Sequence, residues 1–224
     1  MDWTAIWLSV RLSAVTMLLL LAIGLPIAYW MAFSRWRGKF LVEALVALPL
    51  VLPPTVLGFY ILIAISPTSP IGRLYGAAFG ATLPFSFQGL LVASVVYSLP
   101  FAVQPFSAAF KSVDRRLLEA SWCLGESRAA TFVRVVLPMS VPGLLTGMIL
   151  AFAHTLGEFG VVLMVGGNLP GETRTVSISI YDAVQSLDYQ AASETSLLLL
   201  AVSFAILAIT YALQRSVLTV WPMS

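Results

Sequence analysis

The fold of this chain is decided by a long apolar stretch near its N-terminus, residues 12–34, which reads LSAVTMLLLLAIGLPIAYWMAFS. The stretch contains no Asp, Glu, Lys or Arg. A helix needs about 20 apolar residues to cross a hydrocarbon core of ~30 Å. The apolar region of a secretory signal peptide is only about half as long. The stretch is therefore predicted to be a retained membrane span.

The composition extends this prediction to the whole chain. Of 224 residues, 59% are hydrophobic and 10% charged, and the mean hydropathy is +0.95. The charged fraction is roughly half that of an ordinary soluble domain. We expect an all-α membrane protein with a single domain, residues 1–224, folded as a bundle of about five transmembrane helices. The predicted spans are residues 12–34, 44–66, 89–110, 139–160 and 195–215, with a loop over residues 75–88.

The basic residues predict the orientation, because cytoplasmic loops carry an excess of Lys and Arg. Nine of the twelve fall on one side of the predicted spans: Arg35, Arg37, Lys39, Lys111, Arg115, Arg116, Arg128, Arg134 and Arg215. We expect a multi-pass protein of the inner (plasma) membrane, surrounded by lipid, with the N-terminus outside and the C-terminus in the cytoplasm. This bias explains the net charge of +2, which therefore gives no indication of nucleic-acid binding.

The second predicted span contains more prolines than a helix that only anchors the chain in the membrane would need. Residues 48–58 read LPLVLPPTVLG, and each proline removes a backbone donor and clashes with the preceding turn. Broken backbone at membrane depth is tolerated only against protein or a watery cavity. We expect this span to line a pathway, the alternative being a proline-kinked packing helix. The candidate pathway residues here are Pro53, Pro54 and Thr55, with Ser98 and Gln104 as a weaker counterpart in the third span.

Glu158 is another polar residue, and it lies near the end of the fourth predicted span. An ionisable residue at membrane depth indicates function by default. If the fourth span ends near Gly157, however, Glu158 is merely interfacial, and both interpretations remain open. His154 is the only histidine and Cys123 the only cysteine, so no metal site is predicted. We expect a hydrogen-bonded packing role for His154 and no catalytic residues in this chain.

Residues 111–134 form the longest predicted cytoplasmic loop. Asp114 is suited to cap one short helix, Gly125 to end it, and Ser127 to cap a second helix. Two short helices with mixed apolar and basic faces are typical of a docking element for a soluble partner.

This loop resembles the EAA motif of ABC importer permeases. The matching positions are Glu119, Ala120, Ser121, Gly125, Val135, Leu137 and Pro138, with Ser121 in place of the usual alanine and Val135 in place of isoleucine. The resemblance implies a type I ABC importer permease fold. It also implies that residues 111–134 are the coupling loop, which docks on an ATP-binding subunit through these residues.

Three further stretches narrow the resemblance. Residues 48–58, residues 156–160 (LGEFG) and residues 168–175 (NLPGETRT) resemble the permeases of molybdate importers, and the similarity extends over nearly the whole chain. The resemblance implies a tetrahedral oxyanion as substrate, molybdate first, with sulfate or tungstate as alternatives. The identity of the anion depends on this resemblance alone.

The chain lacks the Gly-x-x-x-x-Gly-Lys-Ser/Thr loop that holds nucleotide phosphates. No cofactor is therefore expected on this chain, and ATP and Mg²⁺ are expected on a partner. The resemblance implies a homodimer with two ATP-binding subunits and an extracytoplasmic oxyanion-binding protein, working by alternating access. A secondary transporter is the rival prediction, although it would normally have more spans and more intramembrane carboxylates. Residues 176–184 are expected either to dip back toward the pathway or to lie on the surface.

Overall fold

The structure, a computed structural model, describes the backbone of residues 1–220 and the side chains of residues 1–212. Within these residues every regular element is helical. Arg215, predicted to be cytoplasmic, lies outside the described side chains. In chain order the elements are α1 (Trp3–Phe33), α2 (Lys39–Val51), α3 (Pro54–Ala64), α4 (Pro70–Phe79), α5 (Phe87–Ser112), α6 (Arg115–Cys123), α7 (Arg128–Thr131), the π-helix η1 (Phe132–Val136), α8 (Leu137–Leu156), α9 (Gly160–Gly166), α10 (Val176–Gln185) and α11 (Tyr189–Val220).

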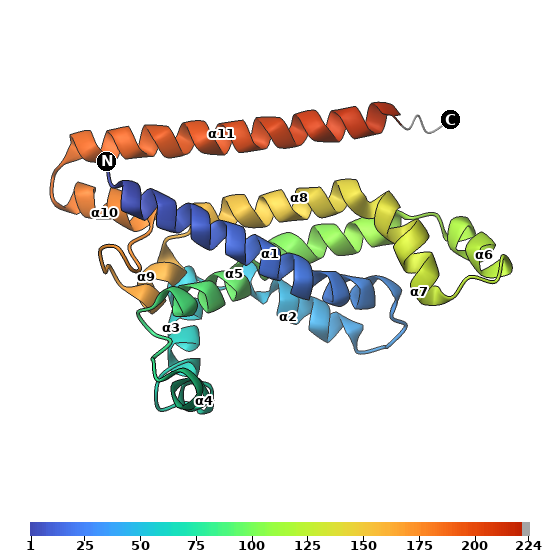
Figure 1. The fold of residues 1–224 in the computed structure, drawn as a ribbon, viewed down its shortest axis with the longest axis horizontal. Helices are drawn as coiled ribbons and strands as arrows, with labels where there is room; N and C mark the ends of the chain where they lie inside the picture. Colours follow the sequence, from blue (N-terminus) through green and yellow to red (C-terminus); the bar gives the residue numbers. More distant parts are fainter. Residues whose placement is uncertain (221–224) are drawn as a thin grey trace.

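Three long helices, α1, α5 and α8, pack side by side and form the core (Figure 1). Their shared interior contains Leu20 from α1, Phe106 and Phe110 from α5, and Leu144 from α8. Gly147 on α8 lets the Phe106 ring approach closely, since a Cβ at that glycine would lie 2.7 Å from the ring. The core is thus continuous across three segments that are distant in sequence.

The number of spans is four, or five as predicted if one bent pair of helices counts as a span. Among the described residues, four helical segments are long and apolar enough to cross a membrane: α1, α5, the continuous segment Arg128–Leu156, and α11 over Tyr189–Ala212. The fifth, predicted as residues 44–66, is a pair of helices, α2 and α3, bent by 115°. The bend falls at the Leu52–Pro53–Pro54 sequence, where two consecutive residues cannot donate a backbone hydrogen bond.

The first span extends beyond the predicted residues 12–34. Asp2 caps α1 by accepting a hydrogen bond from the backbone N–H of Ala5 at 3.0 Å, which moves the helix start to Trp3. Trp3 and Trp7 are exposed near one end of α1, and Trp30 lies exposed near the other. Tryptophan is enriched at both membrane interfaces, so their positions fit a helix that crosses the bilayer.

The prediction of a loop over residues 75–88 is wrong for residues 75–79, which are helical. Helix α4 continues to Phe79, because Ser69 caps it by accepting a hydrogen bond from the Gly72 N–H at 2.9 Å and Pro70 occupies its first position. The helix is amphipathic, and short helices of this kind are hard to distinguish from loops in a glycine-containing sequence. The loop proper spans residues 80–86 and leads into α5.

Helices α3 and α9, each following a break in the chain, pack closely against each other. A Cβ at Gly58 would lie 2.7 Å from Cβ of Met164, and a Cβ at Gly160 would lie 2.7 Å from Cβ of Pro54. Only glycine permits this approach at both positions. The close packing of α3 on α9 therefore holds the two breaks next to each other.

We predict that Gly58→Ala lowers the stability of the folded chain. Overpacking costs about 1–3 kcal/mol, and alanine's better helix propensity returns at most about 1 kcal/mol. The measurement is the midpoint of thermal unfolding of the purified protein in detergent. Gly76→Ala is the matched control, since a Cβ there meets only the Ala81 carbonyl oxygen, at 3.8 Å. Equal midpoints for the two variants would contradict the close packing of α3 on α9.

Candidate functional site

The two chain breaks meet where α3 packs against α9. The break between α2 and α3 lies at Leu52 and Pro53, and the break between α8 and α9 covers residues 157–159. Pro54, the first residue of α3, contacts Gly160, the first residue of α9. Two helix N-termini and the chain segments leading into them therefore form one irregular region, which we call the broken-helix site.

Glu158 is buried at this site, with only 4% of its surface exposed. Neither carboxylate oxygen has a hydrogen-bond partner within the described chain, and Ser94 on α5 faces the carboxylate. Ser94 lies seven residues into α5, which corresponds to about 10 Å along the helix axis at 1.5 Å per residue. Of the two interpretations of Glu158, its place beside Ser94 favours the one within the membrane-spanning bundle.

Ser98 links α5 to the last turn of α8. Its hydroxyl lies 2.9 Å from Nδ1 of His154 and 2.9 Å from the hydroxyl of Thr155. The Phe101 ring stacks on the imidazole at a centroid distance of 3.9 Å. The expected hydrogen-bonded packing role of His154 is confirmed.

The predicted pathway residues separate into two groups. Pro53, Pro54 and Thr55 are exposed, whereas Ser98 and Glu158 are buried. Gln104 is exposed on α5, nearly two turns beyond Ser98, and does not join this cluster.

Sequence reasoning missed Ser94 and Thr155. The four-residue spacing of Ser94 and Ser98 places both on one face of a helix, which is a signal that could have found the first. Thr155 gave no such signal, because its role depends on Ser98, which is 57 residues away.

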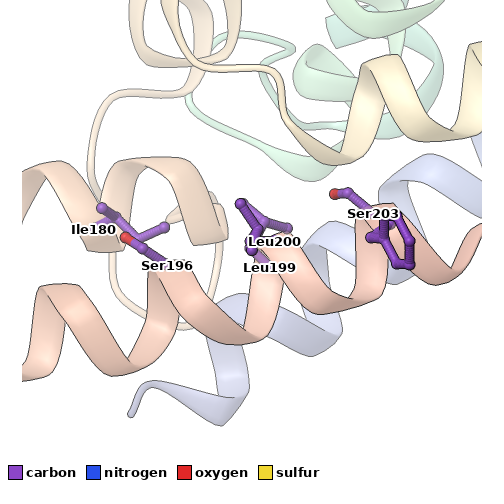
Figure 2. Close-up of a pocket in the computed structure, with 6 residues that line it drawn as sticks. Ile180, Ser196, Leu199, Leu200 and Ser203 are labelled. Carbon is purple, nitrogen blue, oxygen red and sulfur yellow. The ribbon is translucent and has the colours of Figure 1, made fainter. Parts of the chain in front are cut away.

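A separate open groove lies between α10 and α11, with a volume of about 560 Å³. Figure 2 shows its lining, which consists of four apolar side chains and two serines: Ile180, Ser196, Leu199, Leu200, Ser203 and Phe204. Since no charged side chain lines it, this groove is poorly suited to a small anion. Helix α10, over which a re-entrant or a surface position was expected, is anchored at its start by a hydrogen bond from the Val176 N–H to the Ser9 hydroxyl at 2.8 Å.

The loop over residues 111–134 folds into the two predicted short helices. Asp114 caps α6 by accepting a hydrogen bond from the Arg116 N–H at 2.9 Å, and Ser127 caps α7 by accepting one from the Ala130 N–H at 3.2 Å. Gly125 stands between them with a φ of +86°, in the left-handed region that favours glycine. The predicted caps and the predicted helix end are confirmed.

This element is fastened internally by polar contacts. The Ser121 and Thr131 hydroxyls form a buried hydrogen bond of 2.9 Å between α6 and α7, and Glu126 forms an ion pair with Arg134. Figure 1 shows α6 projecting from the same end of the bundle as the connection between α1 and α2. These contacts hold α6 and α7 in a fixed arrangement relative to each other.

The residues that match the EAA motif occupy different surroundings. Glu119, Ala120 and Gly125 are exposed, whereas Ser121 turns inward to Thr131. Val135, Leu137 and Pro138 lie at the junction of η1 and α8. Leu124, next to the glycine, is 86% exposed. Sequence reasoning did not single out Leu124, because an apolar residue in an amphipathic helix is usually buried.

The arrangement of broken spans and a projecting helical pair is typical of transport proteins. Residues 24–218 match the family described as "Binding-protein-dependent transport system inner membrane component". The chain belongs to this family. As a permease it is not itself an enzyme.

Two relatives of known name are similar to this chain in sequence. The permease is 49% identical over 214 residues to the molybdenum transport system permease protein ModB of Azotobacter vinelandii, covering 96% of this chain and 95% of that protein. It is 34% identical over 192 residues to the sulfate transport system permease protein CysT of Synechocystis, covering 86% and 67%.

A solved structure supports the fold. The MetNI methionine ABC transporter in an inward-facing conformation aligns with a TM-score of 0.73 at 18% identity, covering 95% of this chain and 94% of that one. The likeness establishes the expected type I ABC importer permease fold.

Proposed function

We propose that this permease is the membrane subunit of an ATP-driven importer that moves molybdate into the cytoplasm. The observation that carries the proposal is the 49% identity to a molybdenum transport permease over almost the full length of both chains. The stretches around the two chain breaks, which carried the resemblance in the sequence, are also the ones that meet in the broken-helix site. Sulfate is the weaker alternative, because the sulfate relative is less similar to this chain and is longer than it. Tungstate is a further alternative, since it shares the tetrahedral shape of molybdate and sulfate.

The transporter is a homodimer of this chain with two ATP-binding subunits and an extracytoplasmic oxyanion-binding protein. ATP and Mg²⁺ bind to the ATP-binding subunits. A two-fold axis places the same helices of each copy on opposite walls of one pathway. ATP-driven closure of the two ATP-binding subunits then switches the pathway between inward-facing and outward-facing states.

The N-terminus of the permease faces outside and its C-terminus the cytoplasm. Support comes from the basic residues, which gather near the connection between α1 and α2 and on α6 and α7, at the same end of the bundle (Figure 1). Cytoplasmic loops carry such an excess of positive charge.

The ATP-binding subunits dock on the exposed surface of α6. Glu119, Ala120 and Gly125 lie on this surface, and Leu124 supplies its most exposed apolar side chain. An exposed leucine beyond the membrane end of the bundle fits burial in a protein partner. Ser121, Val135, Leu137 and Pro138 act behind this surface by holding the element in place.

The pathway passes the broken-helix site. Thr55 provides its hydroxyl and its backbone N–H as donors for a dianion, since Pro54 has no N–H and the N–H groups of Val56 and Leu57 bond to the Pro53 carbonyl. The helix N-terminus adds partial positive charge. Such weak, distributed donors suit a substrate that must be released. Ser98 and Glu158 lie behind this surface, where Ser98 holds α5 against α8.

We predict that cells that lack their own molybdate permease regain molybdate uptake when they receive this chain with its ATP-binding subunit and binding protein. Uptake of labelled molybdate is measured with and without a large excess of unlabelled sulfate. Molybdate uptake that resists sulfate and stops on ATP depletion supports the proposal. Complete competition by sulfate would make sulfate the substrate, and uptake that survives ATP depletion but collapses with the proton gradient would favour a secondary transporter.

We predict that Gly125→Leu lowers uptake by about tenfold or more, because a left-handed backbone costs a non-glycine residue ~1–2 kcal/mol and the docking surface must shift. Co-purification of the ATP-binding subunit should weaken, while the amount of permease in the membrane stays normal. Gly171→Leu is the matched control: its φ is +80°, and an added Cβ meets nothing within 4 Å at either glycine. Normal co-purification with Gly125→Leu would refute docking on α6.

We predict that Thr55→Val lowers molybdate uptake by about tenfold, since a hydrogen bond to a charged group is worth roughly 1.5–3 kcal/mol. The shape of the side chain is kept, so the complex should still purify intact. Thr82→Val, at an exposed threonine in the loop before α5, is the control. Wild-type uptake kinetics for Thr55→Val would place the pathway elsewhere.

A further inference from the structure

The junction between the docking element and the membrane helices is a π-helix, η1. The Leu137 N–H bonds to the carbonyl of Phe132, five residues earlier, which makes a wider turn than an α-helix. Such turns are rare and are often found at functional sites. This turn connects α7 to α8 within the continuous helical segment Arg128–Leu156.

One side chain, Phe132, carries contacts past this turn in two directions. Its ring lies edge-on to Tyr29 of α1 at a centroid distance of 4.8 Å and edge-on to Phe110 of α5 at 5.6 Å. Phe110 is fully buried. Edge-to-face pairs in this distance range are attractive beyond the area they bury. The first residue of the π-helix therefore contacts two membrane helices other than the one it leads into.

The docking element is fastened to this same point. Thr131, which forms the buried hydrogen bond with Ser121 of α6, directly precedes Phe132. Leu118 of α6 belongs to the same buried cluster as Phe110. A displacement of α6 therefore acts on Phe132 through the neighbouring Thr131 and on the buried cluster around Phe110.

We propose that Phe132 is a positioning residue that transmits movement of α6 to α1 and α5 through its contacts with Tyr29 and Phe110. The inference rests on the proposed ATP-driven function. It makes α1 a moving part of the permease core, although α1 lies far from the docking element in sequence. Close-packed rings transmit displacement because packed interiors are not easily compressed.

The test uses the complete transporter in proteoliposomes: the permease, wild-type ATP-binding subunits and the binding protein. The quantity measured is molybdate transported per ATP hydrolysed, or sulfate if sulfate proves to be the substrate. Phe132→Ala should lower this ratio by about tenfold, the size expected for losing two aromatic contacts, with ATP hydrolysis and co-purification of the ATP-binding subunit near wild type. Phe132→Tyr should preserve the ratio, because the ring remains.

Two further variants separate transmission from a local structural role. Tyr29→Leu, on α1, should lower the same ratio, and Tyr29→Leu combined with Phe132→Ala should be no worse than Phe132→Ala alone. Val133→Ala is the matched control, since Val133 is the next residue of the π-helix and is 58% exposed.

Several results would overturn the inference. An unchanged ratio in Phe132→Ala, a wild-type ratio in Tyr29→Leu, or a proportional fall of hydrolysis and transport would each do so. Absence of ATP-dependent transport by the wild-type complex would instead contradict the proposed function itself, so the two failures are distinguishable.

Discussion

The structure depends on one constraint: a bilayer offers no water to the polar groups of an interrupted helix. The chain interrupts two of its apolar segments, at Leu52–Pro53 and at residues 157–159. The interruptions survive because α3 and α9 cover each other, with Gly58 against Met164 and Gly160 against Pro54. The carboxylate of Glu158, in the second break, is buried without a hydrogen-bond partner among the described residues.

The opposite end of the bundle carries the short helices α6 and α7. Here the chain leaves the membrane and builds a small element, α6 and α7, whose own core is minimal. Its shape is kept by specific polar contacts, the Ser121–Thr131 hydrogen bond and the Glu126–Arg134 ion pair. The ring of Phe132, which follows α7, contacts Tyr29 of α1. Helix α1 is distant from α6 and α7 in the sequence. One end of the permease thus carries an irregular backbone at two chain breaks, and the other carries a pair of short helices.

Much of the fold was predictable because it depends on local composition. Capping residues such as Asp114 and Ser127 act within three residues of their own position, so their effect could be read directly from the sequence. The consecutive prolines predicted a break between α2 and α3, but they did not predict its angle of 115°. Residues 75–79 were misassigned as loop, since a short amphipathic helix at the edge of the bundle leaves a weak apolar pattern. In the candidate site, Glu158 and Ser98 were found from their polarity, while Ser94 and Thr155 were not.

The sequence by itself determined that this is a helical membrane protein with about five spans, that its second span is broken, and that residues 111–134 form a pair of capped helices. These properties follow from hydropathy, proline chemistry and capping, which act over a few residues. Only the tertiary structure decided that the two breaks meet, that Ser121 faces inward while Leu124 faces out, and that Phe132 contacts Tyr29 across about a hundred residues of chain. Such contacts depend on how helices pack, and the periodicity of one segment can indicate its buried face but not which distant segment covers that face.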